Sequence, residues 1–470
     1  MTEPDRQGKN RVPLSLRHAT RRLLILLDTC LPRDPVSTGF LRVFCLALSI
    51  RLLFLMRVIV RHPALWQVSD FSFSEIGNIA VNIFEGRGFS APFSRGSTPT
   101  AWECPLIPYL WAALMWSLGG ANGRTREWLI LCQSIPSSLS VAFYWLIARY
   151  LTTGSRGFPS FGAALAAVVL SFWPESILSL TNLWYFCWQE LGVVVLVLLG
   201  IRWCDRPNIT TGAALGAVAG VVALININPI PIFAVALIIP MLRNGNVCAL
   251  QAAALSVGIA ALIITPWIIR NAMVFGRFYP IRSNAPFELF QGNNPEGCIR
   301  EQATLLHPAS DPHEFELYKS LGESKYVTWS GQRAAAYIRH HPALTAWRAA
   351  ERFYVAWCTD LFDQWPWSPS DRSWPNRDIV TISLFGLVAL TLVIFGLMSR
   401  CLFGLPHPEL FLSVFVFLPL PHYFTQVDND YTQLVRSWLA LFAVLVLIKQ
   451  KADTNPVQQT QDSELAHNIQ

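Results

Sequence analysis

Ten apolar segments recur along this 470-residue chain and constrain its fold more than any other feature. Their approximate ranges are 40–60, 128–150, 160–181, 189–203, 211–227, 229–242, 247–269, 378–397, 408–425 and 433–449. A run of about 20 apolar residues is what a helix needs to cross the hydrocarbon core of a bilayer. Charged residues make up only 14% of the chain, whereas soluble proteins carry about 25%. The sequence therefore predicts an all-α polytopic membrane protein with about ten transmembrane helices.

A shorter apolar stretch at 106–119 decides on which side of the membrane each later segment lies. If it does not cross, the later cytoplasmic turns are all basic and contain, in order, Arg149 with Arg156, Arg202 with Arg206, Arg243, Arg400, and Lys449 with Lys451. Cytoplasmic loops of membrane proteins carry an excess of lysine and arginine. We therefore predict that 106–119 is a juxtamembrane helix and that both termini are cytoplasmic. The run 212–242 is broken near Pro229, and a single crossing there would invert the later part.

The predicted topology divides the chain into seven parts. These are a cytoplasmic basic N-terminal segment (1–39), a first transmembrane helix (40–60), an extracytoplasmic catalytic loop with juxtamembrane helices (61–127), a transmembrane bundle (128–270), an extracytoplasmic subdomain (271–377), C-terminal transmembrane helices (378–449) and a disordered cytoplasmic tail (450–470). Two helices are expected in the subdomain, at 330–339 and 342–357.

The first outer loop carries carboxylates, glycines, prolines and aromatics instead of a plain connection. Its first part predicts a helix over 72–84, because Glu75, Asn78 and Asn82 recur at helical spacing on one face and apolar residues form the other. Gly86 and Gly88 predict where the helix ends. We expect this helix to lie along the membrane surface, with its polar stripe at the rim of a cavity.

Carboxylates of this loop are the candidate catalytic bases. An outward-facing enzyme has no nucleotide pool, so a membrane-delivered prenyl-phosphate sugar is the natural donor. Transfer from it needs a carboxylate that takes a proton from the acceptor hydroxyl. We rank Glu75 and Asp70 together as this base, and Glu103 after them. For any one of the three, the alternative is a solvated loop carboxylate.

The leaving phosphate needs a cation, and Arg270 is the first candidate because it stands where an apolar span ends on the outer side. The alternative is an arginine whose side chain only reaches the interface. Arg282, Arg87 and Arg436 are lesser candidates. Glu190 lies near the outer ends of two spans, and an acid in an apolar stretch is a functional candidate by default. We also assign Asn78 and Glu103 to substrate binding.

Metal and nucleic-acid binding find little support in the sequence. The ten cysteines include no CxxC pair, and the nine histidines show no paired ligand spacing. No cofactor is therefore assigned, and a divalent metal at the phosphate is left open. The net charge of +6 is spread over membrane turns and forms no basic stripe with interleaved aromatics, which argues against nucleic acid as a partner.

Several stretches together resemble bacterial GT-C superfamily glycosyltransferases, near the protein O-mannosyltransferases and the aminoarabinose and Rgt-type lipopolysaccharide sugar transferases. They are EIGNIAVNIFEGRGFSAPF, PTAWECPLIPYL, TPWIIRNAMVFGRFYPIRSN, FELFQGNNPEG, HPASDPHEFELYKSLGESKY and AAAYIRHHPALTAWRAAERFYVAW. The resemblance implies a GT-C-like bundle in a bacterial inner membrane. It also implies an inverting hexosyl- or pentosyltransferase that faces the periplasm or exterior and uses a polyprenyl-phosphate donor.

The resemblance extends to single residues. Members of this group use an acid of the first outer loop as base, which corresponds to Glu75 or Asp70 here. Their end motif pairs an arginine with a tyrosine before the last span, and this chain keeps Tyr431 but has Asp430 at the arginine position. Two other functions fit parts of the sequence: a polymerase or ligase of lipid-linked glycans, and a transporter or flippase.

Overall fold

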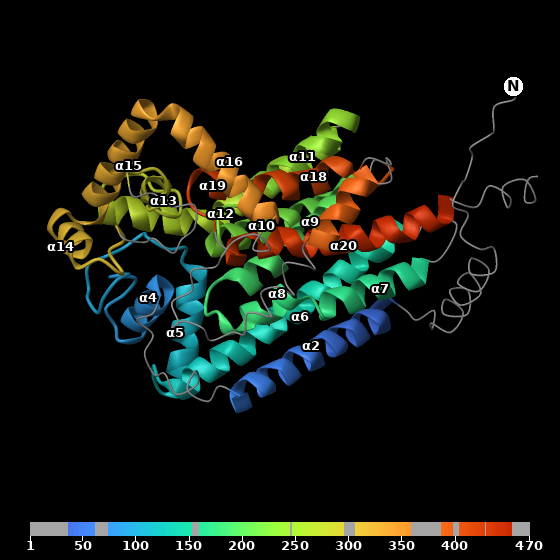
Figure 1. Cartoon of the computed structure of the whole chain (residues 1–470), viewed down its shortest axis with the longest axis horizontal. Helices are drawn as coiled ribbons and strands as arrows, with labels where there is room; N and C mark the ends of the chain where they lie inside the picture. The colour runs from blue at the N-terminus through green and yellow to red at the C-terminus, as the bar shows by residue number, and fades with distance from the viewer. Residues whose placement is uncertain are drawn as a thin grey trace, which may run out of the picture.

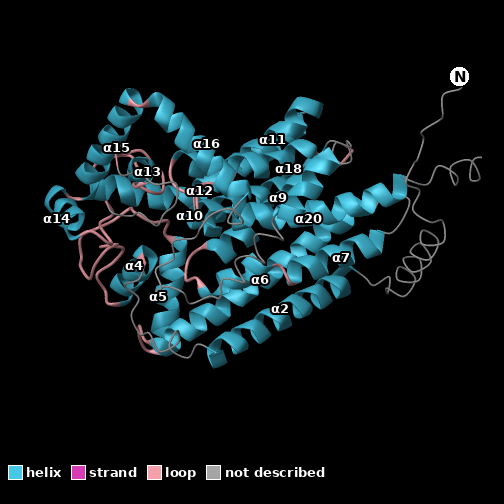
Figure 2. Cartoon of the chain, in the orientation of Figure 1, coloured by secondary structure: helices cyan, strands magenta, loops and turns pink. Residues whose placement is uncertain are grey.

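The computed structural model describes residues 36–61, 74–152, 159–244, 247–295, 306–358, 387–397, 404–427 and 429–453. Figure 2 shows that helices dominate this part of the chain and that loops concentrate at one end. Within these ranges, the β pairing is limited to an isolated bridge between Ser90 and Pro99. The architecture is all-α, as the apolar segments predict.

The helices follow the predicted segments in order. Those in the apolar runs are α2 (Val36–Arg61), α6 (Gly123–Thr152), α7 (Pro159–Ser171), α8 (Pro174–Leu178), α9 (Phe186–Asp205), α10 (Ile209–Ile225), α11 (Ile230–Asn244), α12 (Val247–Phe275), α18 (Pro408–Phe417), α19 (Leu420–Phe424) and α20 (Asn429–Asp453). A further apolar helix covers Leu387–Leu397. The connecting segments contain α4 (Glu75–Phe84), α5 (Leu106–Leu118), α13 (Ala285–Gly292), α14 (Pro312–Leu321), α15 (Glu323–His340) and α16 (Pro342–Cys358).

The predicted count of ten membrane spans is not supported by these helices. In the described ranges, α2, α6, α9 and α12 are long and apolar enough to cross, and α7 with α8, bent by 47°, adds a fifth if the pair is one span. The other apolar stretches of the bundle, including Gln433–Ile448 within α20, are only 10–17 residues long, and a crossing needs about 20. The break after Ile225 separates α10 from α11 as Pro229 predicts, and both helices are short. The fold fits an all-α, multi-pass membrane protein with fewer full-length spans than expected.

The bundle is organised around α6, which packs against α2, α7 and α9 (Figure 1). A second group forms where α10 packs on α9 and α12. Gly212 and Gly216 of α10 face the α12 backbone at Ala252 and Ser256, where an added side chain would clash. Small residues of this kind let helices approach closely in a membrane.

The connecting segments gather at one end of the molecule. Figure 1 shows α4, α13, α14 and α15 together on the left, while α2, α6, α7 and α20 run lengthwise away from them. We call this region, comprising residues 74–118, 276–295 and 306–341, the loop end. Its two halves are in direct contact, since the Ser283 N–H donates to the Ala101 carbonyl at 2.8 Å. The helices predicted at 330–339 and 342–357 are present as α15 and α16.

Candidate active site

The helix α4 places Glu75 at the loop end. The Ser74 hydroxyl accepts a hydrogen bond from the Gly77 N–H at 3.0 Å and so caps the helix. Glu75 follows as the first helical residue, where the helix dipole favours a carboxylate. Gly86 and Gly88, with φ of +80° and +77°, end the helix in the conformation that glycine allows. The helix predicted over 72–84 is therefore confirmed, with its start at Glu75.

The polar stripe of α4 has a different role from the one predicted. Asn78 and Asn82 are buried, and Asn78 Nδ2 donates to the Pro92 carbonyl at 2.9 Å. Asn82 Nδ2 donates to the carbonyls of Ser90, Ala91 and Ser94 at 3.0–3.1 Å. These bonds hold the loop in place around Ala91, whose φ of +40° is unfavourable for a residue with a side chain. Because these contacts are to backbone, Asn78 shapes the loop beside the site, and α4 is embedded in protein instead of lying free on a surface.

Arg282 is the centre of a cluster of carboxylates. Its Nη2 lies 3.3 Å from Glu103 Oε1 and 3.7 Å from Glu288 Oε1. Its Nε donates to the Trp102 carbonyl at 3.2 Å and to Asn284 Oδ1 at 3.1 Å. We call Glu75, Glu103, Glu288 and Arg282 the acid cluster. It joins α4, the loop before α5, the segment after α12, and α13.

The carboxyl groups of the acid cluster have raised pKa values. Burial raises the pKa of Glu103 from 4.5 to about 7, although the Arg282 charge opposes the shift. Burial likewise raises the pKa of Glu288 to about 7, and the charges of Glu103 and Glu75 add to it. Burial also raises the pKa of Glu75. For Arg282, burial would lower the pKa, but the neighbouring carboxylates, Glu103 first, raise it above its ordinary value.

Glu75 differs from the other two acids because its close partner is a histidine. His307 Nε2 lies 3.5 Å from Glu75 Oε1, and the two side chains are 13% and 14% exposed. The His307 ring is surrounded by Phe93, Phe287 and Trp102, with ring centroids 5.2–6.4 Å away. Glu75 is thus a partly accessible carboxylate at the edge of an aromatic cluster.

A further buried carboxylate, Glu323, connects the segment 74–118 of the loop end with the segment 276–295. It accepts hydrogen bonds from the Ala101 N–H and the Ser283 hydroxyl, both at 2.7 Å, and from the Tyr318 hydroxyl at 3.1 Å. The Ala101 and Ser283 donors meet Oε1, whereas the Tyr318 hydroxyl and the Thr100 hydroxyl both donate to Oε2. Burial raises the pKa of Glu323 although the donors around it lower it. With its acceptor sites occupied in this way, Glu323 fixes the position of the loop that carries Glu103.

The last third of the chain completes one side of the cluster. Gln426 Nε2 lies 3.5 Å from Glu288 Oε2, and Asn293 Nδ2 donates to the Phe424 carbonyl at 2.7 Å. Gly292 passes so close to the Thr425 carbonyl that any side chain there would clash. The segment between α19 and α20 is therefore held against α13.

Arg270 lies at the loop end but outside the acid cluster. Its guanidinium donates to the Thr100 carbonyl at 2.6 Å and to the Phe89 carbonyl at 2.9 Å, and it stacks 4.8 Å from the Trp267 ring centroid. These contacts hold the first loop against the end of α12. Its predicted role at the leaving phosphate stays a prediction.

The remaining predicted residues lie elsewhere. Arg87 pairs with Glu85 on the surface and donates to Asn82 Oδ1 at 2.8 Å. Glu190 is buried inside the bundle on α9, with Arg51 of α2 as its charged neighbour. Asp70 lies outside the described residues.

Arg436 also lies in the bundle and outside the acid cluster. It is buried on α20 and donates to the Glu175 carboxylate of α8. The Ser176 and Ser437 hydroxyls lie 3.1 Å apart beside this pair. These charges belong to helix packing and not to the acid cluster.

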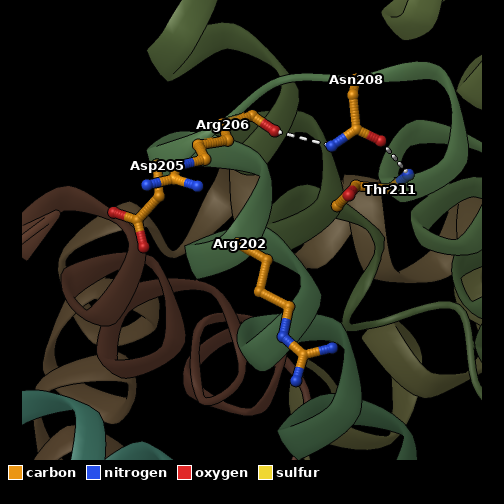
Figure 3. Close-up of a pocket in the computed structure, with 5 residues that line it drawn as sticks. All are labelled: Arg202, Asp205, Arg206, Asn208 and Thr211. Carbon is orange, nitrogen blue, oxygen red and sulfur yellow. Dashed lines mark hydrogen bonds between the residues drawn. The ribbon is translucent and has the colours of Figure 1, made fainter.

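The described part of the chain contains no evident site for a metal ion. Within those residues, no three or more His, Cys, Asp or Glu side chains are arranged to hold a metal ion. The acid cluster also lies apart from the open cavity of about 560 Å³ shown in Figure 3. That cavity is lined by Arg202, Asp205, Arg206, Asn208 and Thr211. It contains none of the predicted site residues.

Two residues of the site were missed by the sequence reasoning. Glu288 lies in FELFQGNNPEG and His307 opens HPASDPHEF, two stretches that carried the resemblance without being assigned a role. Glu288 stands two residues after Pro286, at the start of a short helix, and this position alone is only weak evidence for a functional role. The pairing of Glu288 with Arg282, six residues earlier, depends on the turn between α12 and α13 and could not be deduced from spacing.

Comparisons with known proteins give a structural likeness. No protein-family model matches the sequence, and no curated protein matches it. The fold is similar to a solved structure of the archaeal oligosaccharyltransferase AglB from Archaeoglobus fulgidus, in complex with an inhibitory peptide and a dolichol-phosphate. The TM-score is 0.48 at 14% identity, over 90% of this chain and 52% of that one. The chain thus spans about half the length of that protein, and a likeness at this level assigns it to no family.

Proposed function

We propose that this chain is a membrane glycosyltransferase that moves a sugar from a polyprenyl-phosphate donor to an extracytoplasmic lipid, glycan or protein acceptor. The observation that carries the proposal is the acid cluster. Three carboxylates and one arginine meet at the loop end of a bundle of apolar helices. A donor with an apolar tail and a phosphate sugar headgroup fits such a boundary between apolar and polar protein. The site would face the periplasm or exterior of a bacterial inner membrane.

Glu75 is the base in this mechanism. Glu103 and Glu288 lie within 4 Å of Arg282, whereas Glu75 does not form such a pair and its close partner is His307. Its pKa is raised by burial, which makes the ionised carboxylate a stronger base than an exposed one. Glu75 takes the proton of the acceptor hydroxyl as the acceptor oxygen bonds to the anomeric carbon. The bond from that carbon to the phosphate oxygen breaks at the opposite face, which inverts the configuration.

Arg282 stabilises the polyprenyl phosphate as it leaves. Its Nε and Nη2 are engaged with Trp102, Asn284, Glu103 and Glu288, while its Nη1 has no hydrogen bond to the residues that the structure describes. That nitrogen is available to a phosphate oxygen. A fixed cation placed where negative charge develops is a large contribution to catalysis.

The proposal is tested by Glu75→Gln, which keeps the shape of the side chain but cannot accept the proton. Purified protein in detergent is incubated with a panel of polyprenyl-phosphate sugars, and release of polyprenyl phosphate and glycosylated acceptor are measured. We expect transfer to fall by about 10²–10⁴-fold, the typical contribution of a positioned base. Glu85→Gln, ten residues later at the exposed end of the same helix, is the matched control and should transfer normally. Full transfer by folded Glu75→Gln protein would refute this assignment.

A transporter or flippase is a second candidate, favoured by one observation. The pair Glu175–Arg436 lies buried where α7 and α8 bend by 47°, and buried charges at a broken helix are typical of transport pathways. Reconstituted vesicles would distinguish the two functions. Movement of a prenyl-phosphate sugar across the bilayer without release of polyprenyl phosphate would favour transport.

A further inference from the structure

His307 is held in one orientation by its own turn. Its Nδ1 accepts a hydrogen bond from the Ala309 N–H at 3.0 Å, and its carbonyl accepts from the N–H groups of Ser310 and Asp311 at 3.0 and 2.8 Å. The aromatic rings of Phe93 and Phe287 enclose the imidazole on two sides. The ring therefore has little freedom to turn or to exchange its partners.

This arrangement determines which nitrogen carries the proton. A nitrogen that accepts from an N–H group must present its lone pair, so Nδ1 is unprotonated. Burial lowers the pKa of His307 to about 4, and the ring is neutral at pH 7. A neutral imidazole with an unprotonated Nδ1 carries its single proton on Nε2. This nitrogen lies 3.5 Å from Glu75 Oε1.

We propose that His307 is a positioning residue for Glu75, whose Nε2–H orients the carboxylate and stabilises its ionised form before the acceptor arrives. This inference rests on the proposed function of Glu75 as base. His307 itself takes no proton, because its one free lone pair is occupied by Ala309. The role differs from that of a catalytic histidine, since His307 touches Glu75 and not the reacting atoms.

Among the residues that the structure describes, the other charges around Glu75 are those of the acid cluster. Arg282 favours the ionised form of Glu75, whereas Glu103 and Glu288 are carboxyls that disfavour it. These three groups are unchanged by a substitution at His307. A change in the pH dependence on replacing His307 therefore reports the loss of the Nε2–H.

The experiment compares His307→Gln with His307→Met, because the two side chains have equal length and only glutamine can donate at the Nε2 position. His307→Phe adds a variant that keeps an aromatic ring beside Phe93 and Phe287. We expect Met and Phe to lower kcat about tenfold with little change in the KM for the sugar donor. Without the Nε2–H the pKa of Glu75 rises, so the acidic limb of the kcat profile should move to higher pH. His307→Gln should retain most of kcat and the original limb.

Each outcome bears on one claim. If Gln and Met lower kcat equally, or if Met leaves kcat and the acidic limb unchanged, His307 does not position Glu75. The proposed base still stands in those cases, provided that Glu75→Gln abolishes transfer. If Glu75→Gln transfers normally, Glu75 is not the base and the proposed function is wrong, whatever the pH dependence of kcat in the His307 variants. Should the Phe variant not fold, the Gln and Met pair decides alone.

Discussion

The two groups of buried charges in this protein differ in their balance. Inside the bundle, Arg436 pairs with Glu175, and Arg51 has Glu190 as its charged neighbour. At the loop end, three carboxylates share Arg282. A one-to-one pair satisfies both partners and fixes the helices that carry them. The unequal group leaves proton-binding carboxyls near a single cation, which suits a site that receives a ligand and moves a proton.

The surroundings of the two groups support this distinction. The Glu175–Arg436 pair connects α8 with α20, and the hydroxyls of Ser176 and Ser437 lie beside it. Arg51 of α2 has Glu190 of α9 as a charged neighbour and donates to the Ser137 hydroxyl of α6 at 2.7 Å. Removing one partner of a buried pair leaves the other charge unpaired, which costs far more than the pair itself contributes. At the loop end, side chains come from several connecting segments, and Glu75 and His307 remain partly accessible.

Breaking the bundle pair should have the largest effect on stability. Glu175→Gln leaves the Arg436 charge in the apolar bundle and should lower the free energy of unfolding by about 3–5 kcal/mol. We expect a lower midpoint of thermal unfolding in detergent, followed by static light scattering or tryptophan fluorescence. The double variant Glu175→Gln/Arg436→Met removes both charges and should recover most of the loss. A double variant as unstable as the single one would show that the pair is not the cause.

Removing Arg282, the cation that the three carboxylates share, should have a somewhat smaller effect. This effect should be on activity. Arg282→Met should lower kcat by about 10²–10³-fold, which is the cost of losing one group that stabilises the developing charge. The control is Arg87→Met, another arginine of the loop end, which pairs with Glu85 at the surface and should transfer normally. Donor cleavage by the purified variants measures both. If Arg270→Met loses transfer and folded Arg282→Met does not, the sequence-based choice of Arg270 is correct.

The apolar pattern predicted where the helices lie but not how many cross. Each of the ten apolar segments overlaps one or two apolar helices, and of the segment 378–397 the structure describes 387–397. Span length depends on where a helix breaks, and the bend between α7 and α8 falls at Trp173, directly before Pro174. That proline is a local signal which the sequence prediction did not use. Asn226 and Pro229 did give such a signal, and there the two helices were predicted.

The candidate site contains several residues that the sequence singles out, and their roles stay predictions. Glu75, Glu103 and Arg282 were all candidates, because acids and arginines in a loop between apolar segments are unusual enough to notice. Their grouping was not predicted, since the contacts join residues about 180 positions apart. Asn78 shows the limit of periodicity: its place on the polar face of α4 was correct, but the face is covered by the Pro92 loop.

The smallest expected effect is a pH dependence of stability that separates the two charge groups. Glu103 and Glu288 have pKa values raised by burial from 4.5 to about 7. Between these values the folded state binds more protons than the unfolded state, so their contribution to stability falls as the pH rises from about 4.5 through 7. His307 acts in the opposite sense, because its lowered pKa makes stability rise with pH up to about 6.5. The wild-type curve is therefore mixed, and differences between variants are informative.

Thermal unfolding midpoints of wild type, Glu103→Gln and Glu288→Gln between pH 5 and 8 measure this dependence. Each variant removes a carboxyl that costs stability when it ionises, so its advantage over wild type should grow as the pH rises and level off above about 7. A gain of roughly 1 kcal/mol corresponds to about 1 °C in a chain of this size. Glu85→Gln, at the surface, should follow the wild-type curve. Parallel curves for all four proteins would mean that the acid cluster ionises like exposed carboxylates, and the contrast with the one-to-one pairs of the bundle would then lose its electrostatic basis.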